Sequence, residues 1–191
     1  MNGPADWTAW VTMGLLGGVL AVAAVTDLRT GKVPNAWTYP AIVIGLVWAI
    51  VAGAIQGGGA GAAAGFGNSL IAFAAGFIPF AIIFAAGGFG GGDVKLMGAV
   101  GAISASWECV LATALYALVI GALLAIAVMI RRRLVRRTMA RLFSAALMTA
   151  ARVKPHLPED SPRIPFALAI AIGGIVAGAE TLLGLRTPWA M

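Results

Sequence analysis

Two aspartates at the edges of apolar segments, Asp27 and Asp93, are the residues of this sequence best placed to do chemistry. Asp27 follows the apolar run 8–26, and Asp93 follows a glycine-rich segment that contains Gly90 and Gly92. A carboxylate at the centre of a bilayer costs about 2.5–3.5 kcal/mol on insertion scales, so such residues rarely face lipid. Two carboxyl groups about 3 Å apart share one proton, because both cannot ionise easily. The ionised acid can then activate water while the protonated acid donates to a carbonyl oxygen, which suits peptide hydrolysis.

Paired acids in a membrane also serve functions other than hydrolysis. Transporters carry protons or cations on such residues, and the two aspartates alone fit a protease and a transporter equally well. A non-enzymatic subunit of a membrane assembly is a third alternative. Two further acids, Glu108 and Glu180, fall near the expected outer ends of apolar runs, where we expect them to be solvated at the interface.

The composition indicates that lipid, rather than water, surrounds the elements that carry these acids. The 191-residue chain is 61% hydrophobic and 10% charged, with a mean hydropathy of +0.96. Ordinary globular proteins carry about 25% charged residues, so this chain lacks the polar surface of a soluble domain. We expect an all-α, multi-pass protein of the cell membrane that forms one domain over 1–191.

Long apolar runs indicate about six transmembrane helices. One helix of 94–130 would be roughly 55 Å long, against a hydrocarbon core of about 30 Å. A polar interruption at 104–108 therefore predicts a short helix, 94–106, and a full one, 108–130. The apolar runs are 8–26, 37–55, 60–86, 94–130 and 163–184.

The basic residues predict the orientation. Six helices with an external N-terminus place twelve of the thirteen Lys and Arg residues in the cytoplasm and leave only Arg186 outside. Eight of them lie between Arg131 and Lys154. We expect the basic cytoplasmic loop 131–162 to carry an amphipathic helix that binds anionic membrane lipid, with His156 as a solvated loop residue. The same loop explains the net charge of +6 without nucleic-acid binding.

The short helix predicts an unusual depth for Asp93. A helix over 94–106 spans only about 20 Å, so its start lies below the membrane surface and Asp93 lines a recess open to the cytoplasm. The glycines before it permit close packing and positive φ, and they leave backbone groups free to pair with an extended peptide. Lys95 lies roughly 200° from Asp93 around the helix, so it either snorkels to the interface or reaches a neighbouring helix.

The segment Gly90-Gly91-Gly92-Asp93-Val94-Lys95-Leu96 is similar to the Gly-x-Gly-Asp-x-Lys-Leu signature of a known family, the type IV prepilin peptidases, which are intramembrane aspartic proteases of the Gly-x-Gly-Asp type. Two further motifs resemble those of the same family. The spacing from Asp27 to Pro34-Asn35 resembles their Asp-x6-Pro-Asn element. Pro165-Phe166-Ala167 resembles the Pro-Phe pair that opens their last helix.

The resemblance implies that Asp27 and Asp93 form a catalytic dyad that removes the short basic leader of a pilin-like precursor at the cytoplasmic face. Pro34 and Asn35 would then bind or position the substrate, together with Gly90, Gly92 and Lys95. These extra motif residues favour the protease, since a transporter does not need them and no paired inverted halves are evident.

The resemblance also suggests a peptidase-only enzyme. Long members of the family insert a segment with zinc-binding cysteine pairs after the first helix and N-methylate their product. Here nine residues separate Asp27 from Trp37, and Cys109 is the single cysteine, which we expect to be a packing residue. The chain is therefore similar to the short peptidases of tight-adherence (Flp) pili, and archaeal preflagellin peptidases are a close alternative. No metal and no cofactor is expected, and the oligomeric state is left open.

Overall fold

The computed structural model describes residues 6–88, 90–131 and 165–183, and every regular element in these ranges is an α-helix. The chain separates into two units, 121–164 being one and the remainder the other. The described part of the unit 121–164 is the end of α4, and the expected basic loop over 132–162 lies outside the described residues. The helices are α1 (Asp6–Thr30), α2 (Asn35–Ala85), α3 (Gly91–Ser104), α4 (Trp107–Arg131) and α6 (Phe166–Leu182).

The first helix ends just after Asp27. Gly31 adopts a φ of 66°, and its N–H donates to the Asp27 carbonyl at 2.8 Å. A left-handed glycine at this position closes the last helical turn at little steric cost, so the chain can reverse directly after the aspartate.

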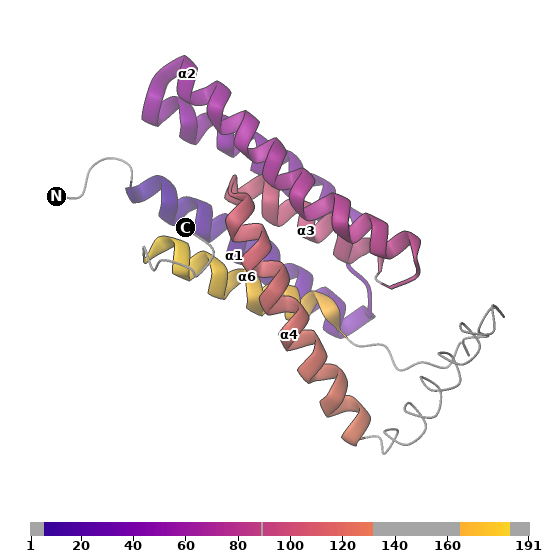
Figure 1. The fold of residues 1–191 in the computed structure, drawn as a ribbon. Helices are drawn as coiled ribbons and strands as arrows, with labels where there is room; N and C mark the ends of the chain where they lie inside the picture. Colours follow the sequence, from indigo (N-terminus) through magenta and orange to yellow (C-terminus); the bar gives the residue numbers. More distant parts are fainter. Residues whose placement is uncertain (1–5, 89, 132–164, 184–191) are drawn as a thin grey trace. The chain divides into compact units, whose positions relative to one another are not determined.

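The long element α2 is a hairpin of two helical limbs, which Figure 1 shows folded back on each other. Its helical geometry breaks at Gly57 and Gly58, where Gly58 has a φ of 60°. The limbs touch through small residues, since a Cβ at Gly61 would overlap the Gly53 carbonyl and a Cβ at Gly65 would overlap that of Ala49. The break falls in the gap that the sequence leaves between the apolar runs 37–55 and 60–86, and the small residues allow the two limbs to pack closely.

The apolar stretch 94–130 divides as the sequence predicts. Ala105, with a φ of 49°, ends α3 in the left-handed conformation, and α4 begins at Trp107. The start of α3 differs from the expectation, because the helix begins at Gly91 and includes Asp93 in its first turn. Glycine has low helix propensity, so the composition of 90–92 alone does not predict this early start.

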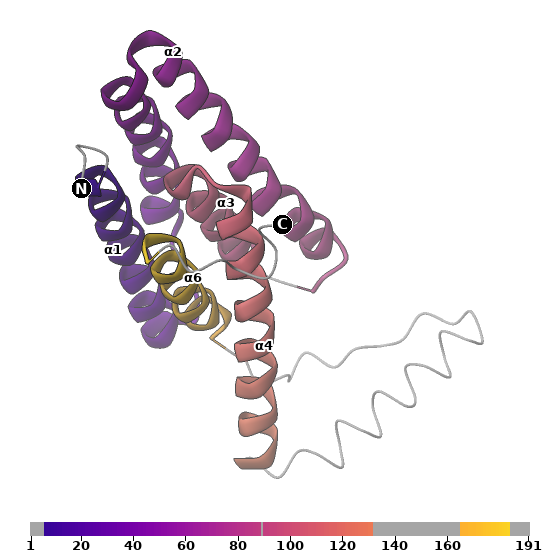
Figure 2. The same ribbon diagram turned by 60° about the vertical axis from the view of Figure 1, so that its left-hand side comes forward.

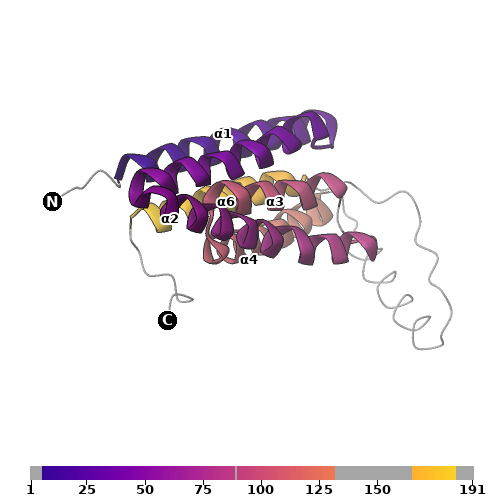
Figure 3. The same ribbon diagram turned by 90° about the horizontal axis from the view of Figure 1, so that it is seen from above.

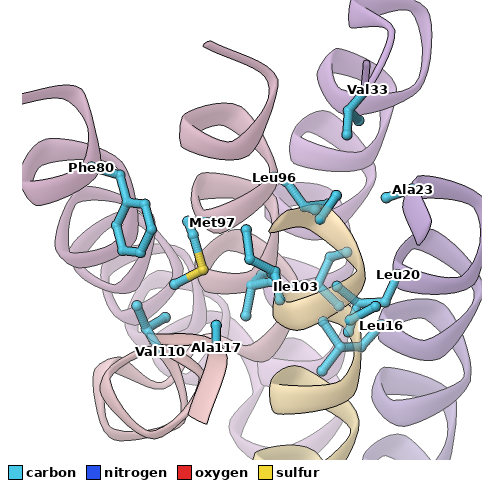
Figure 4. Packing of buried hydrophobic residues seen from close by; sticks show 14 of the residues in the cluster. Leu16, Leu20, Ala23, Val33, Phe80, Leu96, Met97, Ile103, Val110 and Ala117 are labelled. Carbon is cyan, nitrogen blue, oxygen red and sulfur yellow. The ribbon is translucent and has the colours of Figure 1, made fainter. Parts of the chain in front are cut away.

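Among the helices that lie wholly in the larger unit, the most extensive packing is between α1 and α6 and between α2 and α3 (Figure 2). The third helix lies at the centre, and nine of its fourteen residues are buried. Figure 4 shows Leu96 and Met97 of α3 in the middle of the apolar cluster, with Phe80 to one side and Leu16 and Leu20 to the other. This central position holds the aspartate-bearing end of α3 in place.

Three of the described helices, α1, α2 and α4, are long and apolar enough to cross a membrane, and α6 is a shorter apolar helix. Large hydrophobic side chains lie exposed along them, for example Val43 at 59% and Leu123 at 61%. Such exposure is unfavourable in water over so many residues and fits a lipid-facing surface. The described part of the chain is thus all-helical, with helices suited to a membrane, and the count of six crossings stays a prediction.

Candidate active site

Asp27 lies in the last turn of α1 and is buried, with 9% of its surface exposed. Its Oδ2 accepts a hydrogen bond of 3.0 Å from the backbone N–H of Ala167, in the first turn of α6. Pro165 caps that helix and leaves the N–H groups of the first turn without intrahelical acceptors. A helix N-terminus is a favourable place for an anion, so α6 stabilises the charge of Asp27.

Asp93 is the third residue of α3, where a carboxylate is also favoured by the helix dipole. Its Oδ2 accepts a hydrogen bond of 3.3 Å from the N–H of Gly90, the residue that caps the helix. The two carboxyl groups are close enough for the charge of Asp27 to act on Asp93. The fold therefore brings together two acids that lie 66 positions apart in the sequence (27 and 93).

Close backbone contact between two segments produces this approach. A Cβ at Gly92 would lie 3.0 Å from the carbonyl oxygen of Val33, a buried residue in the connection between α1 and α2. The expected positive φ occurs at Gly87, at 83°, whereas Gly90 is extended and Gly92 is helical. Gly92 thus serves close packing against Val33, as expected of the glycine-rich segment, whose positive φ lies at its first glycine.

Lys95 extends to the neighbouring α2. Its Nζ donates to Oδ1 of Asn35 at 2.7 Å and lies 4.7 Å from the ring centroid of Tyr39. Of the two placements expected from the sequence, this is the contact with a neighbouring helix. Tyr39 was not predicted, although it lies one helical turn after Asn35 and therefore shares its face of α2.

The remaining predicted residues have clear structural positions. Pro34 caps the start of α2 with extended geometry, and its fixed φ of −68° fits that position. The Ala167 N–H is a site group that the sequence did not reveal, although Pro165 signalled a helix start there.

Cys109 is buried against Ala112 and Ala177, as a packing residue. Within the described residues, no group of three or more His, Cys, Asp or Glu side chains is placed to hold a metal ion.

The two glutamates differ from their expected solvated state. Glu108 accepts a hydrogen bond of 2.8 Å from Ser106 Oγ, which in turn accepts one from the Cys109 N–H, so the pair caps the start of α4. Glu180 accepts a hydrogen bond of 2.7 Å from the Tyr116 hydroxyl. Each acid has a protein partner, because a half-buried carboxylate needs donors to replace water.

Asp27 and Asp93 each accept a hydrogen bond from a backbone N–H, and the charge of Asp27 acts on Asp93. The model of the type IV leader peptidase family matches residues 14–126, which include Asp27 and Asp93. The curated proteins and the solved structures compared with the chain gave no match. Because the family match covers more than half of the sequence, the chain belongs to the type IV leader peptidase family.

Proposed function

We propose that this protein is an aspartic endopeptidase that removes the leader from a pilin-like precursor at the cytoplasmic face of the cell membrane. The observation that carries the proposal is the approach of Asp27 and Asp93, each with a separate backbone donor. Membership of a leader peptidase family supports the same reaction class and the precursor as substrate.

In the proposed reaction, the ionised aspartate removes a proton from a water molecule while the water oxygen attacks the scissile carbonyl carbon. The protonated aspartate donates its proton to the carbonyl oxygen, giving a neutral tetrahedral intermediate. The intermediate then collapses. Its C–N bond breaks, the departing amine receives a proton from the first acid, and one hydroxyl returns a proton to the second. The dyad ends with one shared proton, as it began.

The proposed substrate lies extended beside the start of α3. Gly90 and the neighbouring Gly88 are exposed, and glycines leave room for a peptide backbone near Asp93. Pro34 and the Asn35–Lys95 contact define the other edge of the site, where they position the helix starts that flank the acids. We further propose that the enzyme is of the short Flp type and leaves the new amino terminus unmethylated.

Co-expression with a pilin-type precursor in a host without its own leader peptidase tests the proposal. Wild-type protein should convert the precursor to the mature form, whereas Asp27→Asn and Asp93→Asn should each abolish conversion, because one carboxyl cannot act as both acid and base. Glu108→Gln is the matched control and should retain full processing. Mass spectrometry of the product should show cleavage before the apolar segment and a free amino terminus.

Undiminished cleavage by either Asn variant, with the variant present in the membrane at wild-type level, would refute the dyad. Absence of cleavage by the wild-type protein for every pilin-type precursor, combined with proton or cation flux in proteoliposomes, would instead support transport through the same acids.

A further inference from the structure

A cavity of about 580 Å³ lies at the end of the helices opposite to the two aspartates. The helices α1, α3 and α6 each present one end to the acids and the other end to this cavity. The start of α1, the turn of α2 and the end of α6 lie together at this end (Figure 3). Its polar lining includes Thr8, Thr12, Trp48, Gln56, Ser104 and Thr181.

Hydrogen bonds preorganise this lining. The Trp48 indole N–H donates to Oγ1 of Thr12 at 2.8 Å, and the Gln56 amide donates to Oγ1 of Thr8 at 3.3 Å. These bonds join α2 to α1, so both helix pairs contribute to one polar wall. The described residues that line the cavity include no Asp, Glu, Lys, Arg or His. A charged ligand would find no countercharge on this wall, so the lining suits an uncharged, hydrogen-bonding group.

Aromatic side chains indicate the depth of the cavity in the membrane. Trp7, Trp10 and Trp107 lie at the same ends of α1 and α4 and are exposed by 47%, 64% and 48%. Exposed tryptophans at helix ends are typical of the belt at the membrane–water interface. The cavity is therefore level with the region in which the glycerol and ester groups of lipids lie.

We propose that this cavity binds the uncharged hydroxyl- or ester-bearing part of a membrane amphiphile. The polar wall supplies hydroxyl, amide and indole groups for the glycerol region. Met13, Ile103 and Leu182 supply apolar surface for the beginning of an acyl chain. The volume lies within the roughly 300–1,000 Å³ common for small-molecule sites. The site shares no residue with the proposed dyad, so this inference does not depend on peptidase activity.

Occupancy has a measurable consequence for stability. The cavity is lined by residues of α1 and α6 as well as by residues of α2 and α3, so a bound amphiphile contacts both helix pairs. A ligand that binds only the folded state raises the thermal midpoint in a concentration-dependent way. The expected signal is therefore saturable binding together with a rising midpoint.

The test uses the purified full-length protein in amphipol, titrated with radiolabelled 1-monooleoylglycerol and, separately, with palmitoyl-oleoyl phosphatidylethanolamine. Saturable binding of 1-monooleoylglycerol alone identifies the ligand as a free monoacylglycerol. Saturable binding of the phosphatidylethanolamine identifies the ligand as a bilayer lipid. Ala52→Phe and Ala64→Leu place bulk at two lining positions on different limbs of α2, and each should weaken binding at least tenfold. Ala54→Phe and Ala63→Leu, at exposed positions outside the lining, should bind as the wild type does.

Oleate is the matched ligand control, because it has the same acyl chain as 1-monooleoylglycerol but a charged head. It should neither saturate nor raise the thermal midpoint. The proposal is overturned if the wild type shows only non-saturable partitioning of both 1-monooleoylglycerol and the phosphatidylethanolamine, if the lining variants bind as strongly as the controls, or if oleate binds equally well. The binding readout is independent of precursor cleavage, so failure here and failure of the proposed function are distinguishable.

Discussion

Asp27 and Asp93 reach one another from helix ends of opposite polarity. Asp27 lies in the last turn of α1, where the helix dipole disfavours a negative charge, and the start of α6 compensates through the Ala167 N–H. Asp93 lies in the first turn of its own helix, and its donor is the N–H of Gly90, which caps that same helix. The stabilisation of Asp27 by the start of α6 is difficult to predict from the sequence, because the donor to Asp27 is a backbone group 140 positions away.

A shared proton predicts a bell-shaped pH dependence of kcat/KM for peptide cleavage by the purified protein. At low pH both acids are protonated and no base is available to activate water, whereas at high pH both are ionised and no acid remains. Activity should therefore fall on both sides of one optimum. An unfolding transition measured at each pH shows whether the protein is still folded, and this separates a loss of catalysis from a loss of the fold. A profile with a single limb across a range in which the protein stays folded would contradict the proton-sharing pair.

The contact between Lys95 and α2 predicts energetic coupling with Asn35. Lys95→Met and Asn35→Leu should each lower the free energy of unfolding by about 0.5–1.5 kcal/mol, and the double variant should lose less than the sum, because both remove the same hydrogen bond. Lys95→Arg should keep most activity. Tyr39→Phe retains the ring under the ammonium and should be silent, whereas Tyr39→Leu should cost about 0.5–1 kcal/mol.

Specific activity, normalised to folded protein, distinguishes a positioning role from a chemical one. We expect Lys95→Met to act chiefly on the amount of folded protein, since its ammonium is committed to Asn35 and Tyr39. A Lys95→Met variant that folds as the wild type does but is as inactive as Asp93→Asn would place Lys95 in the reaction itself.

At the scale of elements, glycines set how closely α3 approaches the second limb of α2. A Cβ at Gly101 would overlap the carbonyl oxygen of Ala72, and a Cβ at Gly76 would overlap that of Met97. Both overlaps involve backbone, which cannot rotate away as a side chain can. These contacts allow a short helix, whose first turn carries Asp93, to lie buried among longer helices.

Gly101→Ala should therefore lower the free energy of unfolding by about 1–3 kcal/mol, the usual cost of overpacking. Gly67→Ala is the matched control. Gly67 lies on the second limb of α2, the limb that α3 approaches, and a Cβ added there has nothing within 4 Å. This variant should be neutral or stabilise the protein by up to about 1 kcal/mol through helix propensity. Denaturant titration in detergent measures both. Equal stability of the two variants would show that α3 does not depend on this close approach.

The sequence predicts the helical segments well because apolar length and glycine-rich or polar interruptions are local signals. The turn at Gly57–Gly58 and the break at Ala105 both fall where those signals place them. The start of α3 does not, because Gly91 and Gly92 have low helix propensity yet lie in its first turn, and the close approach of Gly92 to Val33 is a tertiary contact that no local pattern encodes. Tyr39 could not be predicted as a partner of Lys95 for the same reason, because the contact exists only once α2 and α3 have packed together.

At the scale of the whole molecule, each helix pair contributes one acid to the candidate site. Asp27 belongs to the α1–α6 pair and Asp93 to the α2–α3 pair, so the site forms only where the two pairs meet. The hydrogen bonds from α2 to Thr8 and Thr12 join the pairs at the opposite end. The approach of the acids is thus a property of the assembled larger unit rather than of any single helix.

The orientation of this unit in the membrane is predicted by the distribution of basic residues, and cysteine labelling tests it. In a Cys109→Ser background, Gly57→Cys should react with a membrane-impermeant maleimide added outside intact cells, and Lys32→Cys should react only after the membrane is opened. Gly57 and Lys32 are both exposed, and Gly57 has nothing within 4 Å of an added Cβ. The parent Cys109 is buried, with 3% exposed, so its own reactivity should be low before substitution. The expected result places the aspartates, which lie at the same helix ends as Lys32, on the cytoplasmic side, where an unprocessed precursor presents its leader. Labelling of Lys32→Cys from outside would show that the helices have the opposite orientation in the membrane, and the physical basis for cleavage at the cytoplasmic face would then be lost.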